Sequence, residues 1–147
     1  MLIHLRQLLL RDLATLAKEV EQYPTDESLW VTKAGITNSA GTLVLHLVGN
    51  LRHYIGFRIG GIAYTRDRPA EFATTGLSRS ELLGLIDQAR LAIESLTTID
   101  PARLEETYPE ELFGAPMTTG YFLVHLYGHL RYHAGQVNYH RRMTTAA

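Results

Sequence analysis

The chain has 147 residues, of which 46% are hydrophobic and 20% are charged, a balance typical of a globular protein with one hydrophobic core. Its formal net charge of −1 argues against binding to a nucleic-acid backbone or to an anionic membrane surface. The chain contains no cysteine, which excludes disulfides, cysteine-ligated metal sites and a cysteine nucleophile. We expect a single domain that spans residues 1–147.

The first apolar stretch resembles a signal peptide only briefly, because Asp12 interrupts it early. No run of apolar residues approaches the length that a membrane-spanning helix needs. We therefore expect a cytoplasmic protein.

The first half of the chain predicts two helices. Leucines recur at helical spacing over residues 2–22, and Pro24 ends this segment. A second helix is predicted to begin at Asn38 or Ser39, both good N-caps, and to reach Ile59. The glycine pair at 60–61 then terminates it.

The second half predicts two more helices. One begins at Ser78, which has capping-box spacing to Glu81, and ends before Asp100. The other begins at Thr118 or Thr119 and runs to about Met143.

No segment of similar length alternates like a strand, so we predict an all-α four-helix bundle with long connections. The connections, at about residues 23–38, 60–77 and 97–117, are long enough to cross the bundle and permit several helix orders. The charge cluster at 65–69 is interpreted as a solvated or self-paired loop.

Histidine is the unusual residue, since four of the seven lie between positions 125 and 140. His129 and His133 are four residues apart, a spacing that stacks two imidazoles on one helix face. This pair could hold a metal ion or be ordinary core packing, and spacing alone equally permits a pair made of His125 and His129.

A third ligand would come from another helix, and His46 is the candidate because it lies among residues that must form the core. Gly49 and Gly128 would allow the two helices to approach closely. The residue after His129 is Leu130, where a zinc protease would place its catalytic glutamate, so peptidase chemistry of that type is not expected.

The other histidines have simpler interpretations. His140 lies near a helix end, where a favourable dipole contact explains it. His53 either lines the same interior as His46 or faces a loop, and His4 is expected at the surface.

Two stretches, from His46 to Tyr54 and from His129 to His140, resemble the signature helices of the DinB-like (damage-inducible, YfiT-like) superfamily. The linker from Gly60 to Phe72 is similar to that of one uncharacterised branch, and the resemblance extends over about residues 29–143. Ala134 departs from the pattern, since many relatives carry arginine there.

This resemblance implies an up-down-down-up bundle that is often dimeric, so we expect a homodimer. It also implies a site for one divalent ion, which would be nickel, zinc or iron. The metal ligands implied are His46, His129 and His133, which favours the 129/133 pair over the 125/129 pair.

Three neutral imidazoles leave a coordination position open, as in catalytic sites. Some DinB-like proteins use a metal to activate a low-molecular-weight thiol as co-substrate, and transfer or isomerisation of this type on a small-molecule substrate is our leading functional interpretation. A hydrolase using metal-bound hydroxide and a non-enzymatic, metal-stabilised helical protein remain alternatives. Asn50, Tyr54 and Gln136 are candidates for contacts to the ligands or the substrate, or for hydrogen bonds between helices.

Overall fold

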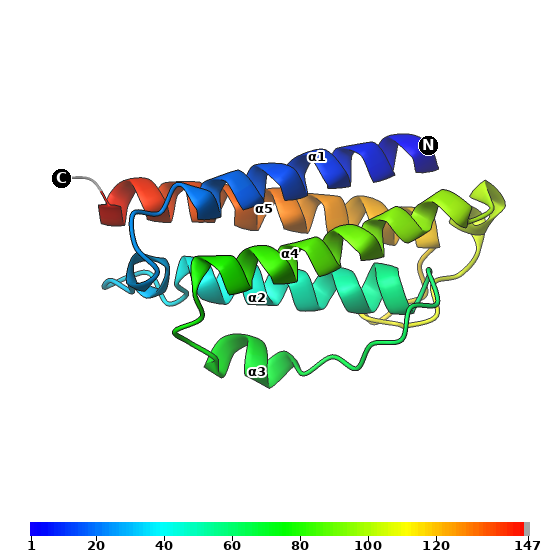
Figure 1. Ribbon diagram of the computed structural model, residues 1–147. Coiled ribbons are helices and arrows are strands. Elements are labelled where there is room, and N and C mark those ends of the chain that lie inside the picture. Colours follow the sequence, from blue (N-terminus) through cyan, green and yellow to red (C-terminus); the bar gives the residue numbers. More distant parts are fainter. Residues whose placement is uncertain (146–147) are drawn as a thin grey trace.

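The computed structural model describes residues 1–145 and contains four long helices (Figure 1). They are α1 (Leu2–Glu21), α2 (Ala40–Leu51), α4 (Arg79–Glu94) and α5 (Thr119–Thr145). The shorter helical segments are Glu27–Trp30, Arg52–Phe57, α3 (Arg68–Ala73), Ser95–Thr98 and Pro101–Glu105. Over the described residues only isolated β-bridges occur and no strand forms, which confirms the all-α prediction.

The four long helices follow the up-down-down-up order (Figure 1). Helices α1 and α5 run in the same direction and lie side by side, as do α2 and α4. Helix α2 also packs against α5, and these two helices are antiparallel. The long crossover between α2 and α4, which includes α3, makes this order possible.

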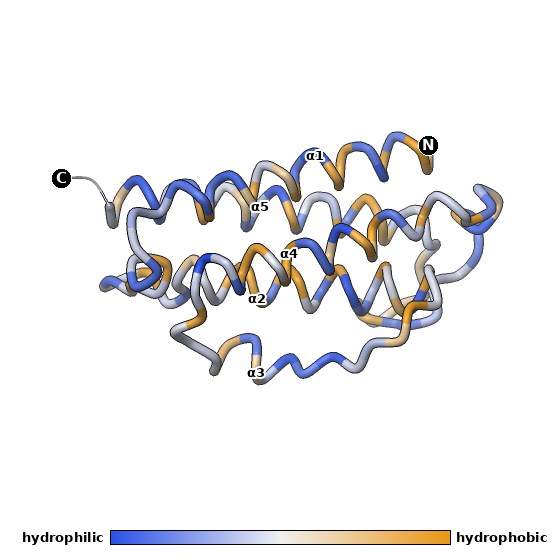
Figure 2. The backbone as a smooth tube through the Cα atoms, in the orientation of Figure 1, coloured by the Kyte–Doolittle hydropathy of each residue, from blue (hydrophilic) through white to orange (hydrophobic). Residues whose placement is uncertain are grey.

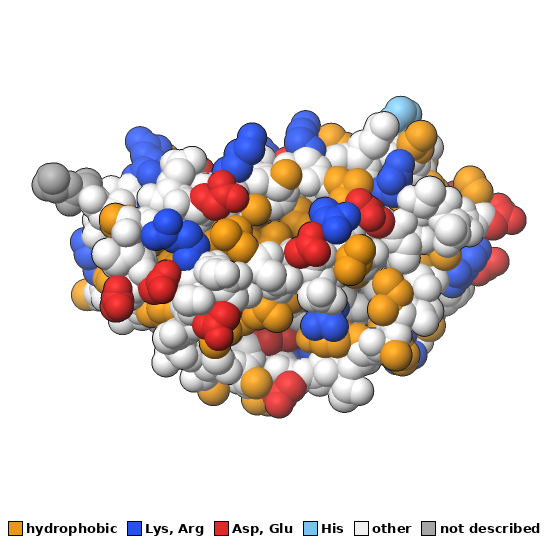
Figure 3. All heavy atoms as spheres, in the orientation of Figure 1, with side chains coloured by type: hydrophobic (Ala, Val, Ile, Leu, Met, Phe, Trp, Pro, Cys, Tyr) orange, Lys and Arg blue, Asp and Glu red, His pale blue; other side chains and the backbone are white. Residues whose placement is uncertain are grey.

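Leucines from all four helices meet in a common core, as the apolar inner faces in Figure 2 indicate. Leu9, Leu16, Leu47, Leu82 and Leu130 are fully buried. The outer face over α1 and α4 carries interspersed charges of both signs (Figure 3). None of the described helices has the combination of length and apolarity that crossing a bilayer requires.

The predicted helix starts are confirmed at two serines. The Ser39 side chain accepts a hydrogen bond from the Thr42 N–H at the start of α2. At the start of α4, Ser78 and Glu81 make both hydrogen bonds of a capping box.

The crossover contains a short helix, α3, where the sequence predicted only a loop. Asp67 caps α3 by accepting a hydrogen bond from the Ala70 N–H, and Pro69 lies in its first turn, where no donor is needed. A six-residue helix is too short to show an apolar period, and it is held by its contacts with α2.

Helix α2 continues to Phe57 as a π-helical segment rather than as regular α-helix to Ile59. The N–H groups of Arg58 and Gly60 donate to carbonyls five residues earlier, at His53 and Ile55. The wider winding changes the direction of the chain after His53, relative to an α-helical continuation.

Candidate metal site

Three imidazoles from two antiparallel helices converge inside the bundle. His46 comes from the middle of α2, and His129 and His133 lie one turn apart on α5. One ring nitrogen from each can be chosen so that all three lie within 4.8 Å of one another. The centroid of the His46 ring lies 5.0 Å from that of the His129 ring and 5.4 Å from that of the His133 ring.

Two of the rings have their Nδ1 atoms held by hydrogen-bond acceptors. His46 Nδ1 lies 3.1 Å from Glu71 Oε1, and His133 Nδ1 lies 2.6 Å from Gln136 Oε1. When Nδ1–H donates to these oxygens, the Nε2 lone pair of each ring is left free to bind a metal.

The Glu71 carboxylate is itself fixed by an arginine. Arg66 donates from Nε to Oε2 at 2.8 Å and from a terminal nitrogen to Oε1 at 2.9 Å. Gly49 makes room for this pair, because a Cβ at position 49 would collide with the Glu71 carboxylate. The crossover between α2 and α4 therefore orients a histidine of the cluster.

Burial favours the neutral form of two imidazoles of α5, those of His129 and His133. Burial, with smaller contributions from positive charge on His133 and His46, lowers the pKa of His129 to about 3. Burial also lowers the pKa of His133, against the opposing effect of its bond to Gln136. Neutral imidazole is the form that binds a metal, so both side chains are ready to act as ligands near pH 7.

Burial alone would raise the pKa of Glu71, but hydrogen bonds from His46 and Arg66 lower it below its usual value. The carboxylate that orients His46 is therefore charged at neutral pH.

The geometry fits a small divalent ion. The Nε2 atoms of His46 and His129 lie 3.1 Å apart. Two imidazole nitrogens bound to one tetrahedral zinc ion would lie about 3.3 Å apart, given zinc–nitrogen distances of about 2.0–2.1 Å. The buried Nδ1 of His129 has no hydrogen-bond partner within residues 1–145.

A cavity of about 310 Å³ opens beside the histidines and is lined by both His46 and His129. Asn50 and Tyr54, one and two turns after His46 on the same helix, also line it. The Tyr108 hydroxyl donates to the Tyr54 carbonyl and ties this wall to the loop before α5. The cavity therefore offers space for a small molecule next to the three histidines.

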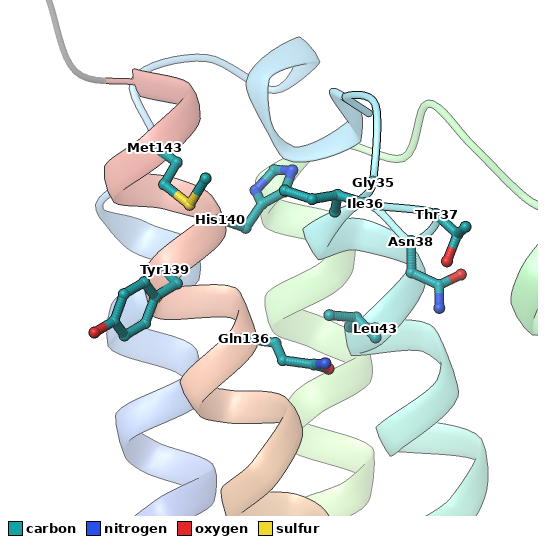
Figure 4. A pocket seen from close by; sticks show the side chains of 9 residues that line it. All are labelled: Gly35, Ile36, Thr37, Asn38, Leu43, Gln136, Tyr139, His140 and Met143. Carbon is teal, nitrogen blue, oxygen red and sulfur yellow. The ribbon is translucent and has the colours of Figure 1, made fainter.

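The remaining candidates from the sequence fall in different places. Gln136 points from α5 toward Leu43 of α2 and lines a separate hollow of about 250 Å³ (Figure 4). His125 lines the cavity beside the cluster but is not part of the group of three, and its ring stacks on Phe122.

The other histidines bind other partners. His140 was expected to make a helix-end contact, but it is buried, with Nδ1 2.7 Å from the Tyr23 hydroxyl and Nε2 2.7 Å from the Val31 carbonyl. His53 faces the loop before α5, with Nε2 3.1 Å from Glu110, and His4 is exposed as predicted.

Three features of the site were missed or misread in the sequence. Arg66 lies in the charge cluster that was interpreted as a solvated or self-paired loop, and Glu71 was not considered. The only signal in the sequence was that both residues lie in the linker from Gly60 to Phe72, which is similar to the linker of one branch of the family. Gly128 has open space beside it, so a close approach of helices does not explain it.

A helical bundle with three convergent histidines and an adjoining cavity defines the class of this protein. A family model of the DinB superfamily matches residues 4–137, and the chain belongs to that superfamily. Its fold is similar to the crystal structure of a DinB-like protein from Bacillus cereus ATCC 10987, with a TM-score of 0.70 and 20% sequence identity. That match covers 92% of this chain and 87% of the other. The comparison with curated proteins gives no match.

Proposed function

We propose that this DinB-superfamily protein binds one divalent ion, either nickel, zinc or iron, through His46, His129 and His133. We propose further that it is an enzyme in which this ion activates a low-molecular-weight thiol for transfer or isomerisation. The observation that carries the proposal is the convergence of three imidazoles beside a cavity.

The ligand set supports a catalytic role for the ion. When bound, an ion held by neutral ligands alone keeps its full charge and supplies Lewis-acid chemistry that lowers the pKa of a thiol or a water molecule. No cysteine occurs in the chain, so a reactive thiol must come from outside.

The residues of the chain position the ligands and the substrate. The hydrogen bonds that Glu71 and Gln136 accept fix the rings of His46 and His133. These two ligands therefore need little reorganisation to bind a metal. Phe122 and Leu126, both buried, provide an apolar floor beside the cluster, and Asn50 presents an amide group to the same space. A substrate bound there would be held near the metal.

Hydrolysis is the second candidate, and His125 is the observation that favours it. Its imidazole lines the cavity beside His129, where it could accept a proton from an attacking water molecule. Against this reading, none of the residues that line the cavity is an aspartate or a glutamate that could act as a carboxylate base.

The two candidates are separated by spectroscopy on cobalt-reconstituted protein. We expect small thiols to produce thiolate-to-cobalt charge-transfer absorption and to react with a generic electrophile faster than free thiol does. Both effects should be lost in His133→Ala. A cobalt spectrum that no thiol perturbs would rule out the thiol-dependent activity, and a metal-dependent esterase rate in the same preparation would favour hydrolysis. An inert site in both assays would support a purely structural metal.

A further inference from the structure

The cavity beside the histidines has an excess of positive charge. Arg66 and Arg68 both line it, and no carboxylate does. Glu71, which does not line the cavity, neutralises Arg66 by accepting two hydrogen bonds from it. Arg68 makes no ion pair within residues 1–145, and its guanidinium lies 5.3 Å from the centre of the Phe72 ring. One arginine is therefore available to a ligand.

The neighbouring acidic side chain is hydrogen-bonded elsewhere and forms no ion pair with Arg68 within the described residues. Asp67 precedes Arg68 in the chain, but its carboxylate caps α3 by accepting from the Ala70 N–H. Asp67 lines a different hollow, on the side of the crossover that faces Arg52. A cation beside a site for a divalent ion makes the cavity attractive to anions.

Part of the cavity lining is aromatic. The rings of Phe113, Phe122 and His125 contact one another, and the His125 centroid lies 4.8 Å from that of Phe113 and 5.8 Å from that of Phe122. Phe113 is 54% exposed although it is a large apolar side chain, and it belongs to the loop before α5. These rings offer an apolar contact surface for the body of a small molecule.

One polar side chain of the cavity lining, that of Asn50, has an atom without a hydrogen-bond partner. Asn50 is 93% buried, since its exposed fraction is 7%, and it lines the cavity. Its Oδ1 atom has no hydrogen-bond donor within the described part of the chain. This oxygen is itself closed off from solvent, so Asn50 contributes a polar part of the cavity lining but no open acceptor.

We propose that the cavity binds a small anionic molecule, with a carboxylate against Arg68. This inference rests on the proposed function, because it describes the thiol or the acceptor that would react at the ion. The aromatic wall formed by Phe113, His125 and Phe122 would contact the carbon skeleton of the same molecule.

The test compares thiols that differ only in charge. Cobalt-reconstituted protein is titrated with N-acetylcysteine and its neutral amide, and with the longer mercaptohexanoate and its neutral amide. Binding is followed by charge-transfer absorption, so no turnover is needed. We expect at least one acid to bind about fivefold more tightly than its amide, as one accessible charge-assisted contact would give.

Arg68→Gln should remove this preference. Arg142→Gln is the matched control, because Arg142 is also a surface arginine that lies over an aromatic ring, that of Tyr139, far along α5 from the cavity. The control variant should keep the preference for the acid.

Other outcomes would overturn the inference in distinguishable ways. Equal binding of acid and amide, or a preference that persists in Arg68→Gln, would remove the anion site while leaving the thiol-dependent function in place. If none of the four thiols changes the cobalt spectrum, the proposed function fails, and the anion site fails with it.

Discussion

At the scale of single residues, His46 is held by a chain of buried polar contacts that begins outside its own helix. Arg66 fixes Glu71, and Glu71 accepts from His46 Nδ1. Such carboxylate–histidine contacts orient metal ligands and raise their basicity. The quality of the site therefore depends on two residues that would never touch the metal.

Glu71→Gln tests this dependence. The amide can still accept a hydrogen bond from His46, but it loses the negative charge and one of the two contacts to Arg66. We expect zinc affinity to fall about 10- to 100-fold, the usual cost of changing such a partner.

Competition with a chromophoric chelator measures this affinity. Asp87→Asn is the control, since it also removes a carboxylate that is bonded to an arginine, here Arg90 on the outside of α4. Zinc affinity within twofold of that of the parent protein would show that Glu71 does not orient the ligand.

The residues of the cluster were predictable from the sequence only in part. Spacing indicated that His129 and His133 share a helix face, but it permitted His125 equally, and only family resemblance favoured one pair. Glu71 could not be found, because its role arises from a contact across 25 residues that no local pattern records.

At the scale of elements, the helix starts followed from short-range chemistry, as the caps at Ser39 and Ser78 illustrate. The π-helical end of α2 did not, since its hydrogen-bond shift leaves no signature in the apolar spacing. His53, at the start of this segment, contacts Glu110 of the loop before α5.

Glu110 connects the loop before α5 to α2 and its extension, and this connection should depend on pH. Burial alone would raise the pKa of Glu110, but hydrogen bonds from Arg58 and His53 lower it below its usual value of 4.5. A carboxyl with a lowered pKa in the folded state stabilises that state above the unfolded pKa, and the stabilisation disappears as pH falls through the folded pKa.

Glu110→Gln should therefore lower the melting temperature at pH 7, and its difference from the parent protein should shrink below about pH 4.5. Thermal unfolding of metal-free protein across this pH range measures the effect, with Glu105→Gln, an exposed site in the same connection, as control. A difference that does not change with pH would contradict the assigned contacts.

At the scale of the whole molecule, the up-down-down-up order places α2 antiparallel to α5, so that the middle of one faces the middle of the other. Periodicity predicted four helices but not this order, because the long connections permitted several. The pairing of α2 with α5 is a property of the complete bundle, and it brings His46 to His129.

The outer surface of α5 leads us to expect a homodimer. Tyr121, Tyr132 and Tyr139 are each more than 60% exposed, which is apolar surface that a second copy could cover. Light scattering at micromolar concentration should give about 33 kDa, twice the chain mass of 16.5 kDa. A mass near that of one chain would contradict the expectation.

The central claim is that His46, His129 and His133 bind one metal ion, and elemental analysis of protein purified without added metal tests it most directly. We expect about one divalent ion per chain, loss of that ion in His46→Ala, His129→Ala and His133→Ala, and retention in His125→Ala. Full occupancy in any of the first three variants, or loss of the ion in His125→Ala, would contradict the assignment.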